Sequence, residues 1–470
     1  MKNNTFNNLL CQGASNVLSK DIPKSKSFAD TTPELNLQTF GVGGLGNFPY
    51  YWQDPFNLSF NSDTYNWISA NLKAGVNPIA QASGSTFTNL YIDVLSKISY
   101  SLSPTSTTEL TDASNNIITQ QQNLLRIWVS VYGSASIDSL INTIINTWTS
   151  PPITLLDLQN SNNLTTDLNQ VPVSGMPILP ILTNYIDALN KSTSLINASS
   201  SNSGYLSAAL AALQTPNRTN GGILLSDNSV QPAYVITTPL QDILNGLKNT
   251  SNTNTIEVTI DRVNDNVISV EVPGQPAFNI HPNDFLKMSV NSDSDLFSTI
   301  LKKSIGPVKL DLSFSGVTMV YFQPVAFNKS NNENWFWTQP VIDAIKNGST
   351  GVTGFKFLPK PNIDFSEEGP YGFLTGVAIS NSPTIDLKVC STDYQTIANS
   401  IQDSDTVELE LLGCAIENES QVSNLTKSVN TDSSTNSVLV SLSPQSVAAP
   451  SVNSRAWVHG VQVEFPAAMK

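Results

Sequence analysis

The side chains best suited to acid–base chemistry are the carboxylates Asp364, Glu367 and Glu368, in the run Asp-Phe-Ser-Glu-Glu-Gly. Paired carboxylates perform glycoside hydrolysis, and they also bind calcium. Adjacent glutamates, however, point in different directions in most backbone conformations. We therefore expect a solvated loop here. A glycosidase-like site at these residues ranks third among three functional hypotheses.

Histidine and cysteine chemistry has few candidates, because the chain contains two histidines and three cysteines. A zinc site would need nearly all of them to converge, and no Gly-x-Ser-x-Gly segment marks a nucleophilic serine. We interpret His459 as structural and His281 as the cap of a short helix. Cys390 and Cys414 form either one disulfide or two buried thiols. We expect no catalytic residues, no metal and no cofactor.

One run of aromatic residues, Trp335, Phe336 and Trp337, is a candidate binding surface after an Asn-rich segment. Three consecutive side chains cannot all face one core if the backbone is extended. Exposed aromatic rings beside amides suit a sugar ring, a lipid interface or a partner chain. The alternative, which we prefer, is that both tryptophans pack under the following helix while Phe336 covers an edge.

A second aromatic run, Tyr50, Tyr51 and Trp52, is a candidate of the same kind. It follows the glycine-rich segment 41–46, which formally matches the dinucleotide-binding pattern Gly-x-Gly-x-x-Gly. That pattern needs a helix to open at once, and Pro49 with three aromatic residues does not favour one. We interpret the segment as a flexible turn leading into an aromatic anchor.

The composition separates this chain from several classes of protein. Charged residues make up 13% of its 470 residues, about half the usual share, and Asn, Ser, Thr and Gln take their place. The net charge of −14 disfavours nucleic-acid binding, because an acidic protein repels phosphates. A weakly charged, amide-rich surface tolerates close approach to its own copies. We therefore expect a homo-oligomer, with a glycan or membrane surface as a further partner.

The N-terminus has no apolar core typical of a secretory signal, and no window is apolar enough for a transmembrane helix. We expect the protein to be made in soluble form. Release from the cell or assembly outside it stays open.

The hydrophobic periodicity indicates an α+β protein, with a mostly helical N-terminal region followed by a β-rich, sandwich-like C-terminal region. We expect a polar arm with a Gly/aromatic segment over 1–63, a helical domain over 64–250 and a sandwich-like domain over 255–470. A flexible loop is expected at 418–437.

The strand and helix patterns within these regions are specific. Val308, Leu310, Leu312 and Phe314 alternate with polar residues before Gly316 interrupts the pattern, which predicts strands on both sides of that glycine. A hairpin is predicted over 256–272. The other predicted strands are 384–389, 407–411 and 461–465. The predicted helices are 65–72, 87–98, 117–148, 181–196, 205–213, 340–347, 392–401 and one at 238–247, capped by Thr238.

The helical candidate over 117–148 carries few charges, because only Arg126 and Asp138 are charged between Gln120 and Ser150. A helix of this kind is either buried at the centre of the N-terminal region, which we prefer, or active at a membrane. The candidate membrane-active residues are Ile137, Leu140, Ile141, Ile144, Ile145 and Trp148.

Three functional hypotheses follow in order. The first is a non-enzymatic structural or surface-binding protein that self-associates. The second is a pore-forming toxin of the insecticidal type, with a membrane-active helical half and a β-rich receptor-binding half. The third is the glycosidase-like enzyme.

Overall fold

The computed structural model describes residues 2–21, 37, 47–49, 53–54, 59–73, 79–132, 179–290, 295–348, 351–416, 425–444 and 455–465. The chain forms two compact units. The first comprises Met1–Val94, Ala209–Thr338 and Asn362–Lys470, and the second comprises Leu95–Ala208 and Gln339–Pro361. The N-terminal part is helical and the C-terminal part is rich in antiparallel strands, which confirms the predicted α+β class. Both units are built from separate stretches of the chain, and the expected boundaries at residues 63 and 250 stay a prediction.

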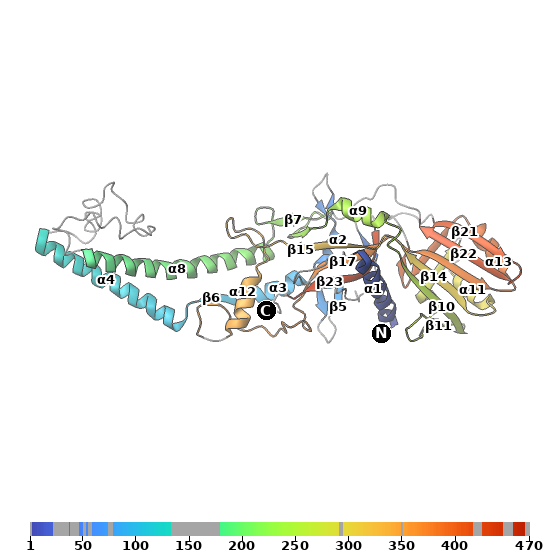
Figure 1. The fold of residues 1–470 in the computed structure, drawn as a ribbon, viewed down its shortest axis with the longest axis horizontal. Helices are drawn as coiled ribbons and strands as arrows, with labels where there is room; N and C mark the ends of the chain where they lie inside the picture. Colours follow the sequence, from blue (N-terminus) through green and yellow to red (C-terminus); the bar gives the residue numbers. More distant parts are fainter. Residues whose placement is uncertain are drawn as a thin grey trace. The chain divides into compact units, whose positions relative to one another are not determined.

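The C-terminal part of the first unit is a sandwich of two antiparallel sheets (Figure 1). The larger sheet has seven strands, in the order β12 (Phe278–Ile280), β11 (Val267–Glu271), β10 (Asn254–Asn264), β14 (Val308–Phe314), β18 (Thr384–Cys390), β22 (Ser437–Pro444) and β21 (Leu425–Asp432). The smaller sheet has three strands, β13 (Leu286–Val290), β19 (Val407–Leu411) and β20 (Cys414–Ala415). Three helices accompany them, α10 (Pro282–Phe285), α11 (Leu296–Lys303) and α13 (Tyr394–Gln402).

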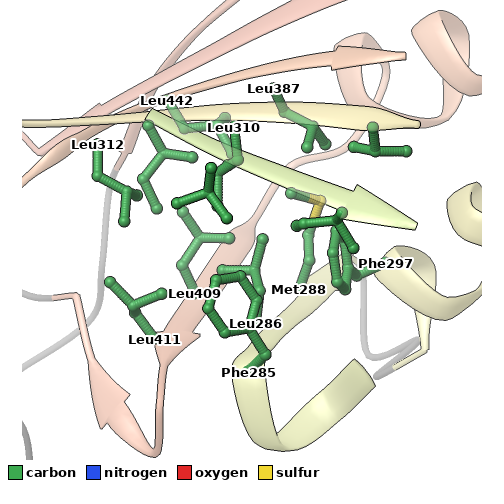
Figure 2. Packing of buried hydrophobic residues seen from close by; sticks show 14 of the residues in the cluster. Phe285, Leu286, Met288, Phe297, Leu310, Leu312, Leu387, Leu409, Leu411 and Leu442 are labelled. Atoms are coloured by element: carbon green, nitrogen blue, oxygen red, sulfur yellow. The ribbon is translucent and has the colours of Figure 1, made fainter. Parts of the chain in front are cut away.

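The core lies between these sheets because alternate residues of each strand are apolar. Figure 2 shows Leu310, Leu312 and Leu387 of the larger sheet facing Leu286 and Leu409 of the smaller one. All five side chains are buried. At roughly 2 kcal/mol for each fully buried leucine, burial of this core is a principal source of the unit's stability.

A further sheet of the first unit has five strands, in the order β1 (Asn47–Pro49), β23 (Arg455–Glu464), β17 (Phe373–Ser380), β15 (Thr318–Pro324) and β9 (Tyr234–Ile236). Gly316 separates β14 from β15, as predicted. The segment 308–324 therefore contributes one strand to the seven-stranded sheet and one to the five-stranded sheet. The φ of 72° at Gly316 favours glycine, and a Cβ there would meet the backbone carbonyl of Leu247.

Several shorter strands and further helices also belong to the first unit. They are α1 (Lys2–Asp21), β2 (Gln53–Asp54), β3 (Ser59–Phe60), α2 (Ser62–Ile68), β4 (Ala70–Lys73), β5 (Ile79–Thr86), α3 (Phe87–Leu95), β7 (Gly222–Leu224), β8 (Val230–Pro232) and α9 (Leu240–Lys248).

The polar arm expected at the N-terminus is wrong for residues 2–21, which form helix α1. Phe6, Leu10, Ala14 and Val17 recur at helical spacing and are buried. Phe6 and Leu10 join the sandwich core, and Ala14 and Val17 pack near Ala378. The segment is polar on average, so its composition did not indicate this narrow apolar stripe.

The second unit is built on two long helices, α4 (Pro104–Tyr132) and most of α8 (Leu179–Gln214), which lie closest toward the C-terminal end of α4 and diverge from there in Figure 1. It also contains β6 (Ile98–Ser101), paired with β16 (Gly354–Phe357), and most of α12 (Thr338–Asn347). Helix α8 replaces the two helices predicted at 181–196 and 205–213. Its Ser- and Asn-rich middle stays helical, and Asn202 donates to the carbonyl of Ala198 one turn back.

Two further local predictions are corrected. Residues 425–432 form β21 instead of a flexible loop, because Leu425, Lys427 and Val429 alternate toward the sandwich interior and pair with β22. Helix α9 begins at Leu240 without a side-chain cap. The Thr238 hydroxyl instead accepts a hydrogen bond from the backbone N–H of Tyr321 in β15, at 2.7 Å. It therefore does not form the predicted capping box at the start of α9.

Candidate interaction surface

The outward side of the seven-stranded sheet is an exposed polar surface. In β10, β14 and β18 the inward residues are apolar and buried, and every second residue points the other way. We call the six outward residues at the centre of this side the charged face: Glu257, Thr259, Lys309, Asp311, Asp386 and Lys388.

Three carboxylates form one row across the charged face. Glu257 of β10 pairs in register with Asp311 of β14, and Asp311 pairs with Asp386 of β18. Neighbouring strands lie about 4.8 Å apart, so each carboxylate has another directly opposite it. Like charges in that position destabilise a sheet. This acidic row therefore opposes the stability of an isolated chain.

A lysine row lies beside the acidic row. Lys309 pairs in register with Lys388, Thr259 of β10 continues the row, and Glu271 of β11 continues it beyond the charged face. The two rows are separated by two residues along each strand, roughly 7 Å. No ion pair joins them among the residues that the structure describes. The charged face therefore presents two parallel rows of opposite sign to solvent.

The electrostatics of Asp311 reflect its place in the middle of the acidic row. Partial burial raises the pKa of its carboxyl group, the neighbouring carboxylates Glu257 and Asp386 raise it further, and Lys309 lowers it. The net rise means that ionised Asp311 is disfavoured in the folded chain. Positive charge brought by a binding partner would relieve this.

The charged face presents ionic groups and hydrogen-bond acceptors on the outer side of a sheet. Its three carboxylates are spread over three strands of an open sheet. Within the described ranges, no cluster of His, Cys, Asp or Glu is arranged to hold a metal ion. The arrangement can recognise a surface whose own charges follow the opposite order.

The predicted aromatic surface at residues 335–337 lies largely in the interior. Trp335 is buried, and its Nε1 donates to the carbonyl of Ala233 at 2.8 Å. Trp337 is buried too, and its backbone exchanges two hydrogen bonds with the hydroxyl of Tyr91 in α3, at 2.7 and 3.0 Å. Half-buried Phe336 packs edge-on against Phe373 at 4.9 Å between ring centroids. This burial excludes both tryptophans as an exposed binding surface, and it places them against α3 rather than only under the following helix.

The other aromatic run, Tyr50, Tyr51 and Trp52, lies outside the described residues. The same is true of the candidate membrane-active residues Ile137, Leu140, Ile141, Ile144, Ile145 and Trp148. Among the helices that the structure describes, none has the length and apolar character that crossing a membrane requires.

The candidate glycosidase residues lie on an exposed loop. Asp364, Glu367 and Glu368 are all exposed. The carboxylate of Asp364 accepts the backbone N–H of Ser366 at 2.9 Å, and hydrogen bonds from Ser366 lower its pKa. Asp364 thus stabilises a local turn, which agrees with the solvated loop that we expected.

The helix cap predicted at His281 is confirmed, and His459 lies in the interior. His459 is buried, with Nε2 at 2.8 Å from the hydroxyl of Ser380, which is equally inaccessible. Nδ1 of His281 accepts the backbone N–H of Asn283 and so caps α10. Cys390 and Cys414 are both thiols, the first half-buried and the second buried.

A polar groove of about 440 Å³ lies between α4 and α8 in the second unit. Its ionic contact is Lys191 Nζ to Glu109 Oε2 at 3.6 Å, between two exposed side chains. An exposed pair of this kind contributes little stability. The residues that line the groove are Glu109, Asp112, Ala113, Asn116, Asn184, Asp187, Ala188 and Lys191.

Sequence reasoning missed the charged face as a site. The alternation of Lys309 and Asp311 marked one wet side of a strand, but it did not reveal which strands would lie beside β14. Matching alternation around Glu257, Asp386 and Lys388 was a usable signal. Comparisons with models of known protein families, with curated proteins and with solved structures find no match for this chain.

Proposed function

We propose that this protein is a non-enzymatic, self-associating protein that acts as a structural subunit or binds a surface, and that the charged face takes part in this binding. The observation that carries the proposal is the order of charges on the exposed sheet: a row of three carboxylates directly beside a row with two lysines. This order destabilises the free chain and becomes favourable against a complementary surface.

The rest of the surface supports the same function. Charged residues are 13% of the chain, so copies meet little charge repulsion outside such patches. In the described part of the helices α4 and α8, the charged residues are Glu109, Asp112, Arg126, Asp187 and Lys191, three negative and two positive.

An enzymatic function has less support. The candidate acidic residues Asp364, Glu367 and Glu368 are exposed on one loop, whereas glycoside hydrolysis needs two carboxylates facing each other across a bound sugar. The pore-forming alternative depends on residues 137–148, so it stays a prediction.

The test is sedimentation velocity of the full chain over a wide range of concentrations, with negative-stain electron microscopy of the same samples, alone and with liposomes. Self-association predicts a sedimentation coefficient that rises with concentration, and regular particles without lipid. A chain that stays monomeric at the highest concentration and shows no particles contradicts the proposal. Rings that appear only on liposomes would instead support the pore-forming alternative.

A further inference from the structure

We propose that two copies of this chain pair through the charged face about a twofold axis, with the lysine row of each copy over the acidic row of the other. This pairing rests on the proposed function, because it names the partner of that surface as a second copy.

The geometry follows from where the rows lie on the strands. A twofold axis between the two faces, parallel to the rows and midway between them, exchanges the acidic and lysine rows. The rotation leaves positions along the rows unchanged. Lys309 and Asp311 are both on β14, and Lys388 and Asp386 are both on β18. Each lysine therefore lies over the other copy's aspartate from the same strand.

The pairing gives an opposite charge to each of the four charged residues on β14 and β18. Lys309 and Lys388 of one copy contact Asp311 and Asp386 of the other, and symmetry repeats this, so two lysines from each copy give four ion pairs. Glu257 lies over the other copy's Thr259, whose hydroxyl can donate to it. An interface that repeats one patch on both partners must be self-complementary in this way.

The residues that flank the acidic row allow a second copy to approach the charged face closely. Next to the acidic row lie Thr255, Ser313 and Thr384, which are in register with one another and have short side chains. Sheets that pack face to face are about 10 Å apart. Lysine and aspartate side chains can bridge that gap, while short hydroxyl side chains beside them do not obstruct it.

A second copy fits this surface better than an unrelated anion or cation does. A polyanion would be repelled by the acidic row, and a polycation by the lysine row, because the rows are closer together than the screening length of about 8 Å at physiological salt. A copy of the same chain supplies both charges at matching spacing. Charge complementarity therefore selects this occupant.

The test uses two variants of the full chain, measured by sedimentation equilibrium. In Lys309→Glu/Lys388→Glu both rows become acidic. In the swap variant Lys309→Asp/Lys388→Asp/Asp311→Lys/Asp386→Lys the rows exchange places, and the net charge stays at −14. All four side chains are exposed or half-buried, and thermal melting checks that both variants fold.

We expect the all-acidic variant to raise the dimer dissociation constant at least about 100-fold, and the swap variant to dimerise like the natural chain. Weakening by added salt is expected for the natural chain and the swap variant alike. If the natural chain associates but the all-acidic variant associates equally well, the twofold pairing is wrong while self-association stands. If the swap variant alone fails, the occupant is a different protein surface. A natural chain that never associates overturns the proposed function itself.

Discussion

His459 Nε2 lies 2.8 Å from Ser380 Oγ, at a junction that solvent does not reach. On the other side of the ring, Nδ1 lies 3.4 Å from Nδ2 of Asn254, which also donates to the carbonyl of Leu10 in α1. The ring also packs at nearly a right angle to that of Phe314, with 5.2 Å between ring centroids and 81° between the ring planes. One neutral imidazole thus connects β23, β17, β10 and the N-terminal helix.

This junction predicts a specific loss of stability in acid. Burial lowers the pKa of His459 from 6.5 to about 3, so between these values the unfolded chain binds the proton and the folded chain does not. The free energy of unfolding is therefore highest above pH 6.5 and falls as the pH drops, by up to about 1.4 kcal/mol per pH unit from this residue. Urea unfolding at several pH values measures the slope.

The control for this prediction uses the two histidines separately. His459→Asn is expected to lower stability at pH 7 and to flatten the slope between pH 6.5 and 3. His281→Asn, at the exposed cap of α10, makes the same substitution outside this junction. Equal slopes in the natural chain and His459→Asn would contradict the assignment.

Gly316 is expected to tolerate no side chain. Its φ is 72°, and an added Cβ would meet the backbone of Leu247. Gly316→Ala should lower the free energy of unfolding by more than about 2 kcal/mol, from strain and steric overlap together. Gly274 has a similar φ of 78°, but a Cβ there meets no described atom within 4 Å. Gly274→Ala should cost only about 1 kcal/mol, and equal losses for the two variants would refute the close approach at Gly316.

Two buried tyrosines, Tyr91 and Tyr371, have ring centroids 6.3 Å apart, and they should respond differently to loss of the hydroxyl group. The Tyr91 hydroxyl makes two hydrogen bonds with the Trp337 backbone, so Tyr91→Phe should destabilise the fold by about 1–2 kcal/mol. The Tyr371 hydroxyl has no hydrogen-bond partner among the described residues. Tyr371→Phe should therefore be neutral or raise stability by about 1 kcal/mol. Chemical denaturation of both variants measures the change in the free energy of unfolding. A large loss of stability in Tyr371→Phe would contradict the absence of a hydrogen-bond partner for this hydroxyl group.

Asp311 is expected to destabilise the isolated chain when it is ionised. Its raised pKa means that stability from this group falls as pH rises through the range just above 3.8. Asp311→Asn should therefore stabilise the monomer near neutral pH, by at most about 0.5 kcal/mol because the group is largely solvated. Below pH 3 the difference should vanish. The comparison requires dilute protein, so that pairing between copies does not contribute.

Asp432 is a control for Asp311, because its ionised carboxylate is expected to stabilise the fold rather than destabilise it. Hydrogen bonds from Ser434 and Thr435 lower its pKa to about 2, so its carboxylate stabilises the turn between β21 and β22 at neutral pH and loses that effect in strong acid. Asp432→Ala should destabilise the fold at pH 7. If Asp311→Asn and Asp432→Ala changed stability in the same direction, the charge repulsion in the acidic row would be refuted.

Local patterns in the sequence predicted individual elements better than their partners. The alternation from Val308 to Phe314 predicted β14, and the turn residues at 264–266 predicted the β10–β11 hairpin. Helix α1 was missed because its apolar residues are too few to raise the average hydrophobicity. Strand β21 was missed because Ser, Thr and Asn dominate the segment, although pairing with β22 satisfies its backbone.

The charged face shows why a site of this kind is hard to predict. Its acidic row joins Glu257, Asp311 and Asp386, which are far apart in sequence and meet only through strand register. A shift of one residue in any strand would turn these side chains to the core. The buried apolar residues determine the register of each strand pair. The residues that lie opposite one another can therefore be identified only when the order of the strands in the sheet is known.

The most direct test of self-association through the charged face is sedimentation equilibrium of the natural chain beside Lys309→Glu/Lys388→Glu, in the same buffer at low salt. We predict a concentration-dependent dimer for the natural chain and a monomer for the variant at equal concentration. A variant that dimerises with the same dissociation constant as the natural chain would contradict the assigned role of the charged face.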